Sequence, residues 1–363
     1  MRLLAIDIGG FTQDILIFDS SQTIENCFKM VLPSPTTILA RRIQAATKAR
    51  RAIFFTGVNM GGGPSKRALA EHLRAGGKAY ATIGAAATFD DNIDEVAKLG
   101  VIIVPAGENI STKNTEIIET RDLDLPKIER ALETFGIEAD FDGIAVAVFD
   151  HGAAPPGTSD RKFRFQHLEQ VVNTKNELTA FAYLATEIPH HLTRMKAVAQ
   201  SITRHIPILL MDTPVAAALG SLEEDKVASQ NHKVLVNVGN FHTLAFHLQG
   251  NSILGFFEHH TGKLTRSKTE KLITRMVKGD LSNEEVFNDS GHGCFIIGSS
   301  YKAPFVSITG PRRVLMSGSK LKPYFATPYG DMMRTGCVGL IRAFAHKIEK
   351  WQAEIDSSLI NLR

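Results

Sequence analysis

Short runs of apolar residues alternate along the chain with segments of helical, amphipathic character. Apolar runs of strand length cover residues 3–6, 15–18, 52–55, 101–104, 144–148 and 208–211. Helices are predicted over residues 36–48, 65–74, 125–135 and about 192–205. Buried strands that alternate with helices in this way are typical of the α/β class.

The second half of the chain follows a polar segment at 223–233, which is the best candidate for a domain boundary. Beyond it we expect three strands with turns at Gly239-Asn240 and Gly250-Asn251. Further elements are predicted as helices over 265–277 and 283–288, a strand over 305–308 and a long terminal helix from Gly336. The segment 152–166 is expected to be a loop.

Two segments share one pattern of strand, Asp or Asn, hydrophobe, Gly turn and strand: LLAIDIGGFTQDILIF at the start and VLVNVGNFHTLAFHL from 234. In the first, Gly9 and Gly10 permit close backbone approach to an anion, and Thr12 adds a hydroxyl. Asp7 ends the strand and is an oxygen ligand suited to Mg²⁺ through water. The alternative is a purely structural turn, although the repeated pattern suggests a duplicated half.

The second hairpin keeps Gly239 but has Asn237 where the first has Asp7, and Asn240 where it has Gly10. Asn tolerates the turn conformation, so the turn survives. Because Asn237 carries no charge, a metal contact through water is weaker there.

Histidines cluster in two places near the second hairpin. His259 and His260 end a predicted strand, and His292 and Cys294 lie in a Gly-rich turn, SGHGC. Adjacent strand residues point to opposite faces, and Zn²⁺ needs three or four converging ligands. A metal site, a substrate or proton-transfer role and structural turns all remain open for this group.

Composition narrows the functional classes. Forty-one Lys and Arg against 38 acidic residues give a net charge of +3, which does not favour a nucleic-acid partner. We expect no membrane span and no signal peptide. Cys27, Cys294 and Cys337 are far apart in sequence and form no disulfide framework, which is consistent with the cytoplasm.

A resemblance emerges at MDTPVAAALGSL, just before the second hairpin. Residues 214–220 resemble the Pro-Thr-Ala-Ala-Ala segment of heat-shock chaperone ATPase domains. The first hairpin is similar to the opening of hydantoinase and activase proteins. The chain therefore resembles the actin-like ATPase superfamily, which includes actin and sugar kinases. This implies two related, ribonuclease H-like α/β domains with mixed sheets flanked by helices, and a nucleotide cleft between them.

The resemblance implies domains at 1–224 and 225–363, an inserted segment around 57–120, and a C-terminal helix that packs back on the first domain. It implies ATP and Mg²⁺ as cofactors, with Asp7 organising the metal. The residues implied to bind nucleotide are Gly9, Gly10, Thr12, Asn237, Gly239, Thr243 and, beside the adenosine, Gly310. Gly336 and Gly339 match close-packing positions of the second hinge helix.

The loop after the strand 144–148 carries Asp150 and His151. In the superfamily this loop often holds the residue that orients water or accepts a substrate proton, so both are candidate catalytic residues. The alternative for Asp150 is a cap on the next turn. Arg161 and Arg164 are candidates to bind an anionic substrate group, or else belong to a solvated loop.

A closer resemblance rests on DIGGFTQDIL, GVNMGGGP, FDHG, EHHTGKL, SGHGC and GDMMRTGC. These segments are similar to a prokaryotic family whose members are sometimes labelled pyruvate formate-lyase activating enzymes. Radical S-adenosylmethionine chemistry needs a cysteine-ligated iron–sulfur cluster, and the three cysteines offer no clustered run.

The expected function is that of an ATP-binding phosphotransferase or ATPase acting on a small molecule. The alternative is a non-catalytic, nucleotide-responsive scaffold or sensor that signals to a protein partner, because Asn237 replaces an acidic residue. A weaker alternative is an accessory protein of a radical enzyme.

Overall fold

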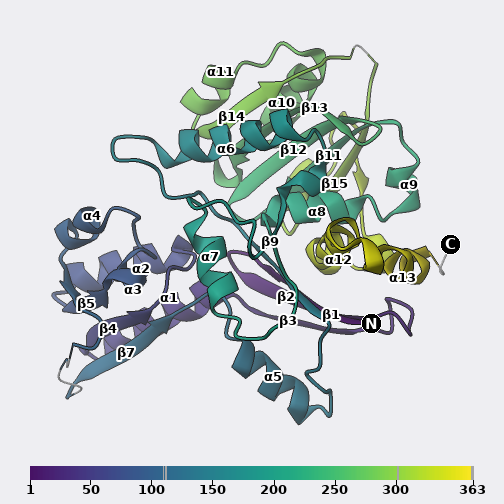
Figure 1. Ribbon diagram of the computed structural model, residues 1–363. Helices are drawn as coiled ribbons and strands as arrows, with labels where there is room; N and C mark the ends of the chain where they lie inside the picture. Colours follow the sequence, from purple (N-terminus) through teal and green to yellow (C-terminus); the bar gives the residue numbers. More distant parts are fainter. Residues whose placement is uncertain (109, 111–112, 301, 361–363) are drawn as a thin grey trace.

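The computed structural model describes residues 1–108, 110, 113–300 and 302–360 (Figure 1). Positions 109, 111 and 112 of the expected insertion, and positions 301 and 361–363 of the expected second domain, lie outside the described residues. Among the described residues, no helix combines the length and apolar character needed to cross a membrane.

Two six-stranded sheets form the main body of the molecule. The first has the order β3-β2-β1-β8-β10-β9, and the second has the order β14-β13-β12-β11-β15-β16. The strands of the first sheet are β1 (Arg2–Ile8), β2 (Thr12–Asp19), β3 (Phe28–Pro33), β8 (Gly143–Val148), β9 (Ala182–Leu184) and β10 (Ile208–Met211). Those of the second are β11 (His232–Val238), β12 (His242–Gln249), β13 (Ser252–His260), β14 (Gly291–Ile296), β15 (Phe305–Thr309) and β16 (Tyr324–Phe325).

The two sheets share one topology. β1 pairs antiparallel with β2 and parallel with β8, and β2 pairs antiparallel with β3. In the same way β11 pairs antiparallel with β12 and parallel with β15, and β12 pairs antiparallel with β13. The expected architecture of two related α/β domains with mixed sheets is therefore confirmed.

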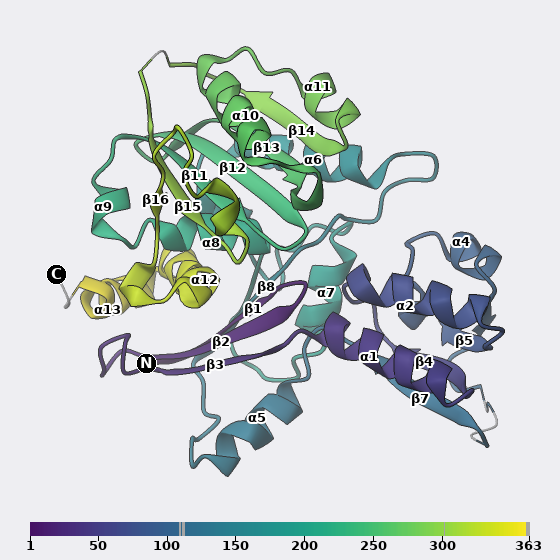
Figure 2. The ribbon, with the colours of Figure 1, turned by 180° about the vertical axis from the view of Figure 1, so that it is seen from behind.

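A third sheet, of four parallel strands, lies between β3 and β8 in sequence, with the order β6-β5-β4-β7. Its strands are β4 (Ala52–Gly57), β5 (Ala79–Thr82), β6 (Val101–Val104) and β7 (Thr115–Thr120). Its helices are α1 (Pro35–Lys48), α2 (Gly63–Arg74), α3 (Ile83–Ala86) and α4 (Ile93–Lys98). Figures 1 and 2 show this unit to one side of the two main sheets. The domain limits given above stay a prediction.

The remaining helices belong to the two main domains. They are α5 (Leu125–Thr134), α6 (Asp160–Thr174), α7 (Thr193–Gln200), α8 (Thr213–Ser221), α9 (Asp225–Ala228), α10 (Arg266–Lys278), α11 (Asn283–Asn288), α12 (Thr335–Lys347) and α13 (Glu349–Ile360). Short 3₁₀ turns complete the chain at Leu178–Phe181, Thr261–Lys263, Arg313–Met316, Pro328–Gly330 and Met332–Arg334.

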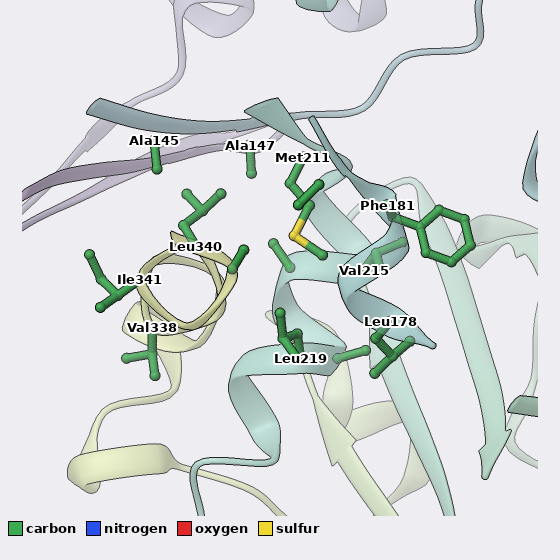
Figure 3. Close-up of a cluster of buried hydrophobic side chains, with 14 of the residues drawn as sticks. Ala145, Ala147, Leu178, Phe181, Met211, Val215, Leu219, Val338, Leu340 and Ile341 are labelled. Atoms are coloured by element: carbon green, nitrogen blue, oxygen red, sulfur yellow. The ribbon is translucent and has the colours of Figure 1, made fainter. Parts of the chain in front are cut away.

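Helices α8 and α12 follow equivalent strands, β10 and β16, and pack against each other between the two main sheets. Figure 3 shows Leu340 and Ile341 of α12 near Ala145 of β8, and Val215 and Leu219 of α8 on the neighbouring side. All five side chains are buried in one apolar cluster. This cluster joins both domains, because it also contains residues from β11, β12 and β13.

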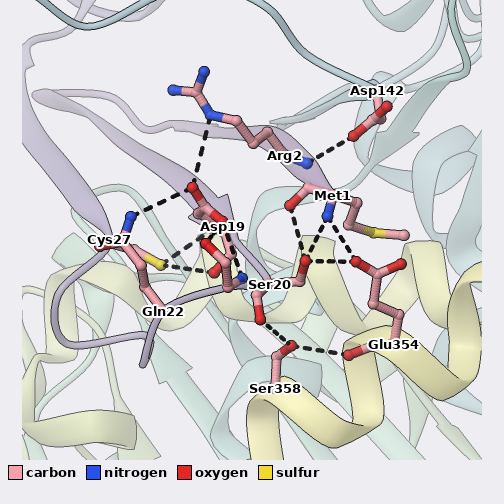
Figure 4. A network of polar contacts seen from close by, with 10 residues as sticks. Met1, Arg2, Asp19, Ser20, Gln22, Cys27, Asp142, Glu354 and Ser358 are labelled. Atoms are coloured by element: carbon pink, nitrogen blue, oxygen red, sulfur yellow. Dashed lines mark hydrogen bonds and ion pairs between the residues drawn. The ribbon is translucent and has the colours of Figure 1, made fainter.

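The single long terminal helix predicted from the sequence is wrong, because the chain breaks at Ile348 into α12 and α13. The segment α13 returns to the start of the chain, where the Met1 amino group and the Ser20 hydroxyl both bind the Glu354 carboxylate (Figure 4). The Ser358 hydroxyl donates to the carbonyl of Ser20. Polar contacts therefore join α13 to the end of the β1–β2 hairpin.

Two loops of the predicted structure are regular elements instead. The expected loop at 152–166 contains the first turns of α6, and the SGHGC turn is the edge strand β14. β14 forms because its backbone pairs antiparallel with β13, a long-range contact that leaves little trace in a Gly-rich sequence.

Candidate functional site

A cleft of about 570 Å³ lies where the two main domains and the third-sheet unit meet. The turns after β1 and β11, the loops after β8 and β15, and the start of α12 contribute to its walls. The third-sheet unit contributes residues 59–63 before and at the start of α2, Lys66, and residues 87–91 after α3.

The two Gly turns make the same backbone hydrogen bond. The Gly9 amide donates to the carbonyl of Thr12 at 2.8 Å, and the Gly239 amide donates to the carbonyl of His242 at 2.9 Å. All four residues line the cleft. The turns thus place equivalent ends of the two hairpins at one cavity.

The tips of the two hairpins touch through aromatic rings. Phe11 and Phe241 stack with ring centroids 5.3 Å apart and an interplanar angle of 23°. A Cβ atom at Gly10 would lie 2.1 Å from the Phe241 ring, so this glycine makes room for the contact. The domains therefore meet at the tips of their equivalent hairpins.

Asp7 sits at the base of the cleft, directly opposite Asp14 in the β1–β2 pairing. Both carboxylates are buried, and Oδ1 of each has no hydrogen-bond partner in the described structure. Burial, reinforced by Asp14, raises the pKa of Asp7 well above its usual value. Burial also raises the pKa of Asp14 to about 7. A cation would relieve this repulsion, and unpartnered carboxylate oxygens suit Mg²⁺.

A glycine in the hinge helix makes space for the Asp7 carboxylate. A Cβ atom at Gly336 would lie 2.0 Å from Asp7 Oδ2. On the other side of the cleft, a Cβ atom at Gly310 would lie 2.5 Å from Asn237 Oδ1, and Gly310 has a φ of +100°. Gly310 and Asn237 both line the cleft, and their role in nucleotide binding stays a prediction.

The predicted role of Thr243 in nucleotide binding is contradicted by the register of β12. Thr243 is buried, its hydroxyl lies 2.9 Å from that of Thr261, and it does not line the cleft. His242 occupies the position equivalent to Thr12, at the start of its strand, and lines the cleft. Because alternate strand residues face opposite ways, a shift of one residue exchanges a cleft side chain for a core side chain.

Asp150 lines the cleft, but backbone groups engage both of its carboxylate oxygens. The Gly152 amide donates to Oδ1 and the Met195 amide to Oδ2, each at 2.9 Å. Burial raises the pKa of Asp150. This geometry favours the capping alternative, in which Asp150 holds the loop after β8 against the start of α7.

Arg164 is fully buried and paired within the protein. Its guanidinium contacts Asp212 at 2.7 Å and Glu258 at 2.8 Å, and donates to the Asp150 carbonyl. It does not line the cleft, so its predicted role with an anionic substrate is wrong. Arg161 likewise lies on α6 rather than in a loop, and donates to the carbonyls of Phe287 and Gly291. Both arginines thus join α6 to the second domain.

The predicted histidines separate into different environments. His259 is buried and its Nε2 lies 3.3 Å from the Asp289 carboxylate, whereas His260 points the other way and lines the cleft. His292 lies with His151 and His242 in a group whose ligand atoms are all within 4.8 Å of one another.

The cysteines remain apart in the fold. The Cys337 thiol, in α12, faces the carbonyls of Ala5 and Asp14, and Cys27 faces Asp19. Cys294 is buried in the apolar cluster of the second domain, and burial raises its thiol pKa to about 12. No three cysteines converge among the described residues.

Several cleft residues were not predicted from the sequence. The residues missed are Asp14, Thr36, Asn59, Lys66, Arg194, His242, Met332 and Met333. The hairpin pattern could have predicted two of them. Asp14 lies on the same face of β2 as Thr12, and His242 occupies the position in β12 that is equivalent to Thr12. Asn59 belongs to GVNMGGGP, whose Gly61, Gly62 and Gly63 line the cleft, but Arg194 carries no local signal.

One family profile matches the chain over residues 60–315, which is more than half of its length. The family is described as "Putative pyruvate format-lyase activating enzyme (DUF1786)". The chain belongs to this family. No curated protein sequence matches it.

Three solved structures illustrate the fold-level similarities. The activator of the 2-hydroxyisocaproyl-CoA dehydratase from Clostridium difficile, with bound ADPNP, is 10% identical, with 97% of this chain and 98% of that chain covered and a TM-score of 0.37. The inorganic polyphosphate/ATP-glucomannokinase from Arthrobacter sp. strain KM is 11% identical, with 95% and 99% covered and a TM-score of 0.36.

The ROK hexokinase from Thermus thermophilus is 13% identical, with a TM-score of 0.25. The match covers 70% of this chain and 49% of that chain, so this chain spans about half the length of the hexokinase. At these identities and TM-scores, the activities of the three proteins do not transfer to this chain.

Proposed function

We propose that this member of the DUF1786 family binds ATP with Mg²⁺ in the cleft between its two domains and acts as a phosphotransferase or ATPase on a small molecule. The observation that carries this proposal is the pair of equivalent Gly turns at one cavity, with an unpartnered oxygen of Asp7 at its base.

The first hairpin supplies the anion-binding part of the proposed site. Gly9, Gly10 and Thr12 line one wall of the cleft, where backbone amides of the turn and the Thr12 hydroxyl would contact phosphate oxygens. Asp7 and Asp14 would hold Mg²⁺, directly or through water. Bound Mg²⁺ would neutralise phosphate charge that the two carboxylates otherwise repel.

The second domain supplies the proposed adenosine side of the site. Gly310 follows β15 and lines the cleft, and the absence of a side chain there leaves room for the Asn237 side chain. Met332 and Met333 precede α12 and line the same cavity. Flexible, polarisable Met side chains suit contact with a flat heteroaromatic ring.

A second candidate function, a nucleotide-responsive sensor, is favoured by two observations. Asn237 brings no charge to the cleft, and both oxygens of Asp150 accept backbone hydrogen bonds, which makes Asp150 a poor general base. In this alternative nucleotide would close the domains without turnover, and a protein partner would respond to the closed form.

Binding is tested by thermal unfolding of the full chain with Mg-ATP, Mg-ADP, ATP with EDTA, and inorganic phosphate. We expect Mg-ATP to raise the Tm of the wild type and to have little effect on Asp7→Asn. Asp140→Asn, at an exposed aspartate, is the matched control and should respond like the wild type. If no nucleotide raises the wild-type Tm, the proposal fails.

Turnover is tested separately by measuring ADP release from Mg-ATP with a panel of sugars, organic acids and water as acceptors. Release that disappears in Asp7→Asn but persists in Asp140→Asn supports the enzyme. Binding without any release supports the sensor.

A further inference from the structure

Three histidines from distant parts of the sequence converge at the edge of the cleft. His151 follows β8 in the first domain, His242 begins β12, and His292 lies in β14. One ring nitrogen of each lies within 4.8 Å of the others. His151 and His242 line the cleft and are half-buried, whereas His292 is 1% exposed.

Three of the six ring nitrogens in this group lack a hydrogen-bond partner among the described residues. Both ring nitrogens of His292 and Nε2 of His242 are buried without a hydrogen bond in the described structure. A buried polar atom without a partner destabilises the folded state, and binding of a ligand from outside the polypeptide would satisfy it.

We propose that His151, His242 and His292 bind one divalent transition-metal ion of the Zn²⁺ type, with a coordination position open to the cleft. Imidazole nitrogen suits Zn²⁺, Fe²⁺, Cu²⁺ and Ni²⁺, and three protein ligands with an open position are typical of catalytic rather than structural zinc sites. This site is separate from the proposed Mg²⁺ position, whose donors are carboxylate oxygens.

The surroundings keep the three imidazoles neutral, as metal binding requires. Burial lowers the pKa of His151 to about 3, with the Arg164 charge as a further cause. Burial also lowers the pKa of His242 and of His292. Neutral rings present lone pairs, and no proton has to be displaced near pH 7.

Aromatic contacts hold the His242 ring in place, and a carboxylate lies near the His292 ring. Phe149 stacks on His242 with centroids 4.0 Å apart and an interplanar angle of 9°, and the Arg164 guanidinium lies over the same Phe149 ring at 3.7 Å. The Glu258 carboxylate lies 3.8 Å from His292 Nδ1. Metal-bound histidines commonly have a carboxylate beside the second ring nitrogen, which raises their basicity.

The ligand atoms must approach one another to bind metal. Nitrogens around a tetrahedral Zn²⁺ at about 2.0–2.1 Å are roughly 3.4 Å apart. To reach that spacing, His151, which comes from a loop, and His242 would have to rotate toward His292. Because His151 belongs to the first domain and the other two to the second, bound metal would link the domains.

The site is tested on full-length protein without a histidine tag, after chelation and dialysis. Zn²⁺ and Co²⁺ are titrated by calorimetry, and Co²⁺ is also followed by its visible absorption. We expect one ion per chain, an absorption band typical of tetrahedral or five-coordinate Co²⁺, and no competition from millimolar Mg²⁺.

The variants are His292→Ala, His242→Ala and His151→Ala, with the exposed His190→Ala as the matched control. Each ligand variant should weaken Zn²⁺ binding by more than about 100-fold, since loss of an outer-shell partner alone costs about 10–100-fold. His190→Ala should bind like the wild type. Circular dichroism checks folding, and the loop position of His151 keeps one variant interpretable if a strand variant unfolds.

Two results would overturn the site. One is a wild type that takes up no stoichiometric Zn²⁺ or Co²⁺. The other is a folded His151→Ala that binds Zn²⁺ with wild-type affinity. Either result leaves the nucleotide proposal untouched, because that proposal rests on Asp7 and is tested with Mg²⁺.

Discussion

Gly220 of α8 and Gly339 of α12 bring the backbones of the two hinge helices into direct contact. A Cβ atom at Gly220 would lie 1.8 Å from the Thr335 carbonyl oxygen, and one at Gly339 would lie 1.9 Å from that of Ala216. The obstructing atoms are backbone rather than flexible side chains, so neither helix can yield without moving as a whole. The close crossing of the two helices therefore requires glycine at both positions.

Gly339→Ala should therefore destabilise the protein. Alanine is the better helix former by about 1 kcal/mol, but overpacking against backbone costs about 1–3 kcal/mol or more. The clash therefore outweighs the helix propensity, and the free energy of unfolding decreases. Urea unfolding should show a lower midpoint. Gly262→Ala is the control, because a Cβ atom there meets nothing within 4 Å. A Gly339→Ala protein as stable as the wild type would contradict the close crossing.

Asp14 should make stability fall with rising pH when Mg²⁺ is absent. Its folded pKa is raised to about 7, while an unfolded aspartate titrates near 4. Between these values the folded state keeps a proton that the unfolded state has lost, so the free energy of unfolding decreases as pH rises.

The test compares Asp14→Asn with the wild type by urea unfolding at pH 5 and pH 8. From pH 5 to pH 8 the free energy of unfolding of the wild type should fall by at least about 1.4 kcal/mol more than that of Asp14→Asn. This difference is the equivalent of one pKa unit. Asp140→Asn serves as the exposed control and should follow the wild type. Parallel pH profiles for Asp14→Asn and wild type would refute the raised pKa.

Phe11 and Phe241 should be energetically coupled. The rings stack across the two hairpin tips while remaining partly exposed, at 48% and 39%. Aromatic pairs of this kind contribute about 0.5–1.5 kcal/mol beyond their buried area. A double-mutant cycle of Phe11→Ala and Phe241→Ala in urea unfolding should return a coupling energy in that range. The pair Phe135→Ala with Phe241→Ala is the control, since Phe135 is 73% exposed elsewhere.

Arg164 should be essential for stability, even though it does not reach the cleft. Its removal leaves Asp212 and Glu258 buried without their cation, and breaking a buried pair in this way costs about 3–5 kcal/mol. Arg164→Met should lower the urea midpoint accordingly. Arg67→Met is the comparison, because the exposed Arg67–Glu71 pair is worth at most about 1 kcal/mol. Equal effects of the two substitutions would contradict the buried network.

The sequence by itself determined the features that depend on local pattern. The two Gly hairpins, the Ala-rich hinge helix after β10 and the placement of Asp7, Gly9 and Gly310 at strand ends could all be predicted, because turn chemistry and strand periodicity act over a few residues. The repeated hairpin pattern also predicted two related domains, which the matching strand orders confirm.

Tertiary structure alone decided which side chains share a space. The register of β12 placed His242 at the cleft and Thr243 in the core, a difference of one residue. Pairing of β14 with β13 brought His292 close to His151, which lies 141 positions earlier in the chain. Long-range ion pairs hold Arg164 away from the cleft. Local propensity carries no information on such contacts, because they arise from packing between elements that are distant in sequence.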